Sequence, residues 1–599
     1  MSYIFVNSFK QGLDARRSKI SAQQGSLYSG KNIHINRGGE IEKRKAFVSK
    51  FTLPAGTFGL HGTRYGIYTF GSKAATTFTS PAIPIGIIYQ QLIAPFTAPA
   101  TVAPEMTEVV SVDTYNGVPY VVARFADGSV YHFFNGVRVT DWDAIVSSST
   151  DMSSFGQALS DMVTLDADVN SSFSTIGGVP TLTISKASAG TFTLAATVAN
   201  ASGGTTNTVS IVSVVAGSST VAQVSKVQLL GATVPADVGD TWTVTVNGRA
   251  YALKMSAAGI GSAVRTYRDK VYATVQGLLY FCDTQNPARW KTSYTTGTAP
   301  NVITHNTFAG FESLSSQTGQ SDTLVALAPY QNALAVFSRR ATQIWRVVAG
   351  DPVDNTPMQF LDNIGTMAPR SAVNFGELDV FFLSDTGIRS LRARDASNAA
   401  VVFDVGTSID PLVIAQLKAE NEVTAAKAVG VIEPREGRYL LAFGNTVYVY
   451  SFFPASNISA WTTYEPGFAI SDWAIQTNQL YCRSGNTIYL YGGDSGDVYD
   501  NSPAEVELSW FDADKPAHRK RFHGLDLSCE GTWTIQYSTD PVSNQFVTAG
   551  YVTGQNFSLP AFGIAGYGTH IGVKLSSNDT TATKLSSAAI HFEFTEPPK

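Results

Sequence analysis

The sequence predicts a mainly β protein: a β-propeller of about six blades, interrupted by a small α+β insertion and followed by a β-sandwich-like domain. Three observations predict this fold class. The chain has 599 residues, too many for one compact core, so we expect three or four domains. Apolar residues make up 44% of it and charged residues only 15%, which is typical of a β-rich protein with uncharged or covered surfaces. Finally, short apolar runs separated by tight turns recur along the chain.

Residues 1–50 are predicted to form a basic N-terminal arm. They hold ten Lys or Arg side chains against three acidic ones, a net charge of +7 that leaves −12 for residues 51–599. Ile33-His34-Ile35, the glycine pair Gly38-Gly39 and Ile41 predict a short hairpin. Such a segment cannot bury a core alone, so it must lie along another domain or another subunit. Its charge indicates an acidic partner, although a solvated basic face remains an alternative.

Residues 51–135 and 266–500 are predicted to be the two parts of the propeller. The first part holds a strand at Gly66–Phe70 and a meander from Val109 to Phe134, with hairpin turns at Asn116-Gly117 and Asp127-Gly128. In the second part, apolar runs start at residues 271, 324, 378, 438 and 480. Multi-stranded units at this spacing are typical of propeller blades. Counting the two earlier units gives about six or seven blades.

Residues 136–265 are predicted to be an inserted α+β module. Charge is sparse there, and Ser, Thr, Ala, Val and Gly dominate. The pattern predicts one helix over Phe155–Asp168 and a small sheet from Thr181–Ile184, Thr191–Ala196, Val209–Val215, Trp242–Val246 and Ala250–Lys254. Residues 501–599 predict a separate β-sandwich-like domain from Glu505–Phe511, Gly524–Leu527, Thr532–Tyr537, Ile571–Leu575 and Ala588–Phe594.

The N-terminus lacks the features of a signal peptide, and no stretch has those of a membrane helix. The most apolar loop, Pro81–Pro104, contains five prolines and therefore cannot form a membrane-spanning helix. The three cysteines are too far apart for a metal site, and we expect them to be buried free thiols: Cys282, Cys482 and Cys529. These features indicate a cytoplasm-like compartment and no stable membrane insertion.

No standard catalytic, phosphate-binding or metal motif is present, so the sequence predicts no enzyme activity, no cofactor and no metal. The pair His518 and His523 has Arg and Lys neighbours rather than ligands. Asp166-x-Asp168-x-Asn170 opens like a calcium loop but lacks the required glycine and glutamate. The basic arm has no interleaved aromatic series for stacking on nucleic acid.

Two alternatives to a structural role remain open. A carbohydrate-binding propeller would carry similar aromatic residues at equivalent places in each blade, whereas here the turns repeat better than the aromatics. A glycan hydrolase would need two carboxylates facing each other across a pocket. Four aspartates are available for this role, although the sequence gives no reason to pair them: Asp385, Asp404, Asp494 and Asp497.

The order of these signals resembles the tail nozzle family of short-tailed bacteriophages, which includes tail tubular protein B and the packaged-DNA stabilisation proteins. Three regions carry the resemblance. The arm carries Phe9, Gly12, Arg16-Arg17, Gly25, Asn32, Gly38-Gly39 and Lys43-Arg44. Residues 334–391 carry ALAVF, Trp345, Asn363-Ile364-Gly365 and FFLSDTGIRSL. Phe155–Val198 and Trp242–Lys254 resemble the small platform module of the family. The match covers most of residues 1–500.

The resemblance implies a structural protein of the virion tail, assembled in the bacterial cytoplasm. Six copies would form a ring below the portal and its adaptor ring. The ring would close and extend the channel that retains the genome and then conducts it. Double-stranded DNA would pass transiently without specific binding, and tail fibres or spikes would dock outside. A net acidic channel wall would let DNA slide, because basic walls bind phosphates.

Two sets of residues are expected to serve this assembly. Arg16, Arg17, Lys43 and Arg44 are expected to make charge-assisted contacts with the adaptor ring or a neighbouring subunit. The proline-rich loop, with Pro81, Pro95 and Pro104, is expected to lie at the channel or its tip.

Overall fold

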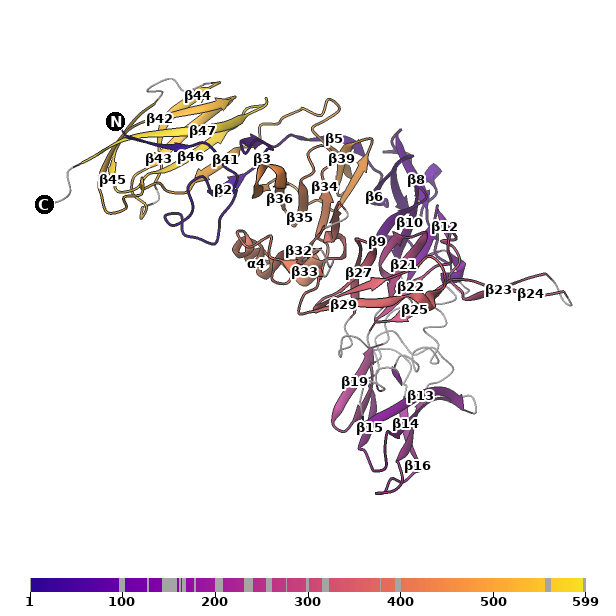
Figure 1. Ribbon diagram of the computed structural model, residues 1–599. Helices are drawn as coiled ribbons and strands as arrows, with labels where there is room; N and C mark the ends of the chain where they lie inside the picture. Colours follow the sequence, from indigo (N-terminus) through magenta and orange to yellow (C-terminus); the bar gives the residue numbers. More distant parts are fainter. Residues whose placement is uncertain are drawn as a thin grey trace.

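The computed structural model is mainly β, as the sequence predicts, and its parts are spread along an extended body (Figure 1). The N-terminus and the C-terminal sheets share one end, and the inserted module lies apart from the rest. No helix in the described ranges is long and apolar enough to cross a membrane. The structure describes residues 2–95, 103–126, 129–142, 159–160, 163, 168–176, 179–199, 208–230, 241–254, 261–275, 277–297, 301–314, 323–376, 379–393, 400–543, 545–554 and 562–595.

Seven groups of three or four paired strands follow one another between residues 47 and 491, and this part of the described chain is called here the seven-sheet region. Six of the groups are separate sheets, and the group over residues 429–464 continues into a nine-stranded sheet. The first three are β6 (Phe58–Thr63), β7 (Gly66–Gly71), β8 (Ile87–Gln91); β9 (Met106–Tyr115), β10 (Val118–Phe125), β11 (Val130–Phe134), β12 (Val137–Arg138); and β20 (Gly261–Tyr267), β21 (Lys270–Val275), β22 (Leu278–Phe281), β25 (Gly310–Ser313). The next two are β26 (Leu324–Tyr330), β27 (Ala333–Ser338), β28 (Ala341–Arg346), β29 (Thr356–Asp362); and β30 (Val373–Phe375), β31 (Asp379–Ser384), β32 (Gly387–Ala393), β33 (Ala400–Phe403). The last two are β34 (Val429–Ile432), β35 (Tyr439–Phe443), β36 (Thr446–Phe453), β37 (Ile458–Tyr464); and β38 (Asp472–Gln476), β39 (Gln479–Ser484), β40 (Thr487–Tyr491), β5 (Phe47–Thr52).

The first strands of these seven sheets contact one another in chain order. β6 contacts β9, β9 contacts β20, and so on through β26, β30 and β34 to β38, which in turn contacts β6. The last sheet combines both ends of the region, because β5 from the N-terminal side pairs antiparallel with β40. Each apolar run predicted from the sequence lies in a different one of the seven sheets.

Tight turns join the strands where the sequence predicts them. Asn116-Gly117 has φ values of 49° and 89°, and Asn247-Gly248 has 51° and 82°, as a two-residue hairpin turn requires. The predicted turn Asp127-Gly128 lies outside the described residues. The proline-rich stretch is not all loop, because it contains β8, which pairs parallel with β7. Leu92 and Ala94 after β8 are buried beside Met106, so apolar packing holds this stretch against the neighbouring strands.

The described part of the inserted module contains two sheets, whereas the sequence predicts a single small sheet beside one helix. The first sheet has the order β13 (Val169–Ile176), β14 (Val179–Lys186), β17 (Val224–Leu230) and β16 (Thr208–Val215). The second has β15 (Leu194–Ala199), β18 (Thr241–Val246) and β19 (Arg249–Lys254). Most of the predicted helix 155–168 lies outside the described residues, although Leu159 and Val163 are buried in the module's core.

Helices α4 and α5 and a projecting hairpin lie outside the sheets of the described seven-sheet region. Helix α4 (Asp410–Ala419) contacts β32. Helix α5 (Glu422–Ala426) is capped at its N-terminus by Asn421, whose side chain accepts a hydrogen bond from Thr424 N. The single-turn 3-10 helices are η1 (Ala75–Thr77), η2 (Pro352–Asp354), η3 (Pro369–Ser371) and η4 (Pro454–Ser456). The hairpin β23 (Ser293–Thr296) and β24 (Ile303–Asn306) projects away from the body (Figure 1).

The C-terminal domain is built from strands of both chain ends. One sheet has the order β3 (Ile33–Ile35), β4 (Ile41–Lys43), β47 (Lys584–Phe594), β42 (Lys520–Glu530), β45 (Phe562–Gly568), and β1 (Ser2–Val6) also pairs with β47. The other contains β2 (Leu27–Lys31), β41 (Ala504–Leu508), β46 (Gly572–Ser577), β43 (Thr532–Ser538) and β44 (Val547–Thr553). Side chains from both sheets share one apolar core. The hairpin predicted at residues 33–41 is confirmed as β3–β4.

Candidate functional site

The N-terminal arm lies along the other end of the same chain. Strand β1 pairs with β47, with Ile4 opposite Ile590. Strand β2 pairs antiparallel with β41 and meets β37 in parallel at Lys31 and Thr463. A single nine-stranded sheet therefore runs from β34 through β2 to β44. The arm joins the C-terminal domain to the seven-sheet region.

Lys43 and Arg44 are buried inside this junction, which corrects the expectation that they contact a partner. Lys43 Nζ donates to the backbone carbonyls of Asp500 and Asp579 at 2.8 and 2.5 Å. Arg44 donates to Asn32 Oδ1 at 2.8 Å, to Asp500 Oδ2 at 3.0 Å and to Ser502 Oγ at 2.6 Å. Burial lowers the pKa of Lys43. Apart from Asn32, these partners lie more than 400 positions away in the chain, so no local sequence signal reveals them.

Arg16 and Arg17 remain at the surface. They lie in the turn after β1, where both backbone amides donate to Asp14 Oδ1 at 3.2 and 3.1 Å. The Arg17 side chain is 58% exposed, and its guanidinium lies 3.7 Å from Asp14. The main chain here is fixed by Ala15 N, which donates to Ser408 O. These two arginines are therefore presented to solvent on an anchored turn.

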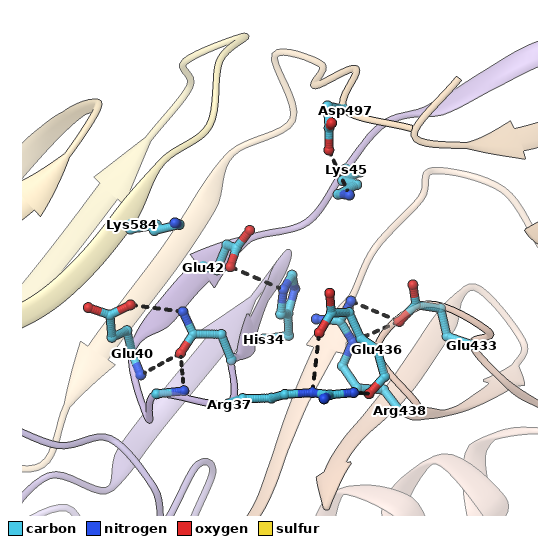
Figure 2. Close-up of polar contacts among 12 residues, drawn as sticks. His34, Arg37, Glu40, Glu42, Lys45, Glu433, Glu436, Arg438, Asp497 and Lys584 are labelled. Carbon is cyan, nitrogen blue, oxygen red and sulfur yellow. Dashed lines mark hydrogen bonds and ion pairs between the residues drawn. The ribbon is translucent and has the colours of Figure 1, made fainter. Parts of the chain in front are cut away.

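A buried polar cluster lies where the arm meets the last two sheets (Figure 2). His34 Nδ1 lies 3.0 Å from the Tyr464 hydroxyl, and its Nε2 lies 4.0 Å from Glu42. Beside it, Arg438 donates two hydrogen bonds to Glu433 Oε2, at 2.9 and 3.2 Å. Both side chains of this ion pair are at least 95% buried. Burial lowers the pKa of His34 well below its usual value, and the positive charges of Arg438 and Lys45 lower it further.

The buried His34 predicts a loss of stability in mild acid. The unfolded chain takes up a proton at a pKa of about 6.5, whereas folded His34 stays neutral. The free energy of unfolding should therefore fall as the pH drops below about 6.5, by at most ~1.4 kcal/mol per pH unit for this group. Urea titrations between pH 7.5 and 5 should show a shallower pH dependence in His34→Gln. The exposed His518→Gln serves as control, and equal slopes in all three proteins would contradict the prediction.

A pocket of about 430 Å³ opens between the last sheets and the first, lined in part by Phe58, Glu108 and Lys427. Asp472 lies in its wall between two arginines: Arg370 approaches Oδ1 at 2.5 Å and Arg483 approaches Oδ2 at 3.4 Å. Burial raises the pKa of Asp472, but the two guanidinium groups outweigh it and the pKa is lowered overall. Arg483 also donates to Thr57 O at 2.7 Å. This ion network connects the sheet of β38 and β39 to η3 and to the segment that precedes β6.

The four aspartates considered for glycan hydrolysis are each engaged by a different cation. Asp385 pairs with Arg339 at 3.2 Å, Asp404 with Arg389 at 2.9 Å, Asp494 with Lys50 at 2.6 Å and Asp497 with Lys45 at 2.9 Å. Two of these cations belong to residues 1–50, so part of the arm's positive charge is matched within the chain.

The other predicted site residues are spread over the molecule. Pro81 is exposed, Pro95 and Pro104 are half-buried, and residues 96–102 between them lie outside the described residues. The three cysteines are buried free thiols, as predicted. Within the described ranges, no group of three or more His, Cys, Asp or Glu side chains is arranged to hold a metal ion. Asp166 of the calcium-like pattern lies outside those ranges, and Asp168 pairs with Lys186.

No protein-family model matches this chain, and no curated protein matches it either. The functional interpretation therefore depends on the residues and contacts described above.

Proposed function

We propose that this protein is a structural subunit of a bacteriophage tail nozzle, part of a ring that retains the genome and then conducts it. The observation that carries the proposal is the nine-stranded sheet from β34 to β44, in which β2 joins two domains. Buried charges of the arm reinforce this join, through Lys43 and Arg44. A chain whose polar contacts unite its domains into one body is suited to transmitting force along a channel wall.

The seven-sheet region is proposed to be a β-propeller of seven blades, the upper value of the six or seven counted from the sequence. The cyclic contacts from β6 through β38 and back to β6 support this arrangement. So does the last sheet, in which β5 joins strands more than 400 residues away. In a propeller, pairing of both chain ends within one blade closes the circle of blades.

The partners proposed for this subunit are further copies of itself, an adaptor ring and tail fibres or spikes. Arg16 and Arg17 are the remaining candidates for charge-assisted contacts with the adaptor, because they are exposed on an anchored turn. A sixfold ring is the number implied by the resemblance to the nozzle family. Pro81, Pro95 and Pro104 are proposed to lie in a loop near the channel or its tip.

Light scattering and negative-stain imaging of the purified chain, alone and with tail components from a phage that encodes it, test this function. We expect a monomer that joins a closed ring on the adaptor. A chain that does not bind the adaptor and instead binds or cleaves cell-surface glycan would overturn the proposal. It would then be a carbohydrate-binding protein or a hydrolase. The matched variant Arg16→Glu/Arg17→Glu should weaken ring formation, whereas Lys31→Glu, in an exposed ion pair with Glu465, should not.

A further inference from the structure

The inserted module exposes an uncharged, apolar edge strand. Strand β16 reads TVSIVSVV, and within the described part of the chain it pairs with β17 alone. Ile211, Val212, Val214 and Val215 are between 37% and 50% exposed. Edge strands of soluble proteins usually carry charges or prolines that prevent further pairing, and β16 has neither, although its register shifts between Ser213 and Val215.

The core face of β16 is only partly covered. Ile211 lies opposite Val227 and shares its face of the sheet. Val227 is fully buried under the second sheet of the module, whereas Ile211 is 41% exposed. The apolar face of the first sheet therefore extends beyond the part that the second sheet buries. A further strand added beside β16 would both bury Ile211 and satisfy the outward backbone groups.

The opposite edge of the same sheet has matching properties. Strand β13 reads VNSSFSTI, has no charged side chain and pairs with β14 alone among the described strands. Because all three pairings in the order β13-β14-β17-β16 are antiparallel, β13 and β16 run in opposite directions. Suppose that a second copy is related to the first by rotation about an axis parallel to the strands. Its β13 then keeps its direction and lies antiparallel to β16 of the first copy. The pairing between the two copies would be antiparallel, like the three pairings within the sheet.

We infer that β16 of one copy pairs with β13 of a second copy of this chain, so that the inserted modules form a continuous sheet around the ring. The choice of head-to-tail rather than two-fold pairing rests on the proposed ring function, because heterologous contacts generate rings. Figure 1 shows the module set apart from the other domains of the chain.

Cysteine cross-linking of the full-length chain tests the pairing. The native cysteines are at most 5% exposed, which leaves a low background for oxidation. Ser172 and Ser174 of β13, and Ser210 and Val212 of β16, all point to the outer face of the sheet. Cysteines are placed at one β13 position and one β16 position in four double variants, which sample the possible registers. We expect at least one variant to form a ladder of disulfide-linked oligomers, while each single variant stays monomeric after denaturation.

The outcomes separate this inference from the ring function. A disulfide dimer of the single variant Ser210→Cys would show two-fold pairing of β16 and overturn the head-to-tail arrangement. Rings that assemble without cross-linking in any double variant would overturn the β16 contact and leave the ring intact. Neither rings nor cross-links would overturn both proposals together.

A charge variant gives a second readout. Ile211→Lys should raise the concentration needed for half-maximal self-association about tenfold or more, because the added strand would bury the lysine on the core face of the sheet without a partner. Val542→Lys, at a 91% exposed position of the C-terminal domain, is the matched control and should leave it unchanged. Equal association of both variants would contradict the inference.

Discussion

Deletion of residues 2–31 is expected to unfold the C-terminal domain while the inserted module stays folded. The deletion removes β1 and β2, and with them the apolar side chains of Ile4, Val6, Phe9, Leu13 and Leu27, all at most 6% exposed. Burial of each such side chain stabilises by about 1.5–3 kcal/mol, so the loss is on the order of 10 kcal/mol. That is comparable with the whole stability of a typical domain, about 5–15 kcal/mol.

Hydrogen exchange followed by mass spectrometry is the appropriate measurement. In the deletion variant, peptides covering β42 and β46 should lose their protection, whereas peptides covering β14 and β17 should keep it. Removal of the projecting hairpin residues 293–306 is the matched control, because its described residues are mostly exposed and its two strands pair with each other. Undiminished protection of β42 after the arm is deleted would show that the C-terminal domain folds without it.

The substitution Arg438→Met is expected to destabilise the sheet β34–β37 by about 3–5 kcal/mol. It leaves the carboxylate of Glu433 buried without its partner, and the cost of an unpaired buried charge is of this size. The double variant Glu433→Gln/Arg438→Met should recover much of the loss, because no charge is then stranded. Urea titration, together with hydrogen exchange at β34 and β35, measures the loss of stability in the single variant and its recovery in the double variant.

The matched control for this pair is Lys31→Met. Lys31 lies 2.8 Å from Glu465, but both side chains are more than 40% exposed. Exposed ion pairs contribute about 0–1 kcal/mol, so this variant should be close to wild type. A double variant no more stable than Arg438→Met would mean that the loss comes from packing rather than from the stranded charge.

The strands of the seven-sheet region were the most predictable part of the fold. Runs such as Leu324–Tyr330 and Tyr439–Phe443 are apolar, of strand length and bounded by Gly or Asn turns, so the local pattern is enough to identify them. Strands without that pattern were missed. β6, FGLHGT, is interrupted by glycines, and β13, VNSSFSTI, is mostly polar because one of its faces is exposed along its length. β17 in the inserted module was missed as well.

The candidate site could be predicted only in part. The composition of residues 1–50 shows that the arm must pack on another surface, and the structure places it on its own C-terminal domain. The roles of individual cations depend on contacts distant in sequence. The pair Lys43-Arg44 and the pair Arg16-Arg17 look alike in the sequence. Lys43 and Arg44 are buried because the carbonyls of Asp500 and Asp579 accept from Lys43 and the carboxylate of Asp500 accepts from Arg44.

The pairing of β1 with β47 also sets the order in which the protein can be completed. During synthesis the first strand emerges from the ribosome more than 570 residues before its partner. At about 5–20 residues per second, it waits roughly half a minute to two minutes in the unpaired state. A chain that terminates before β47 leaves β1 without the strand it pairs with, whereas β4 keeps its pairing with β3. Only a chain that is translated beyond β47 can therefore complete the core to which both chain ends contribute.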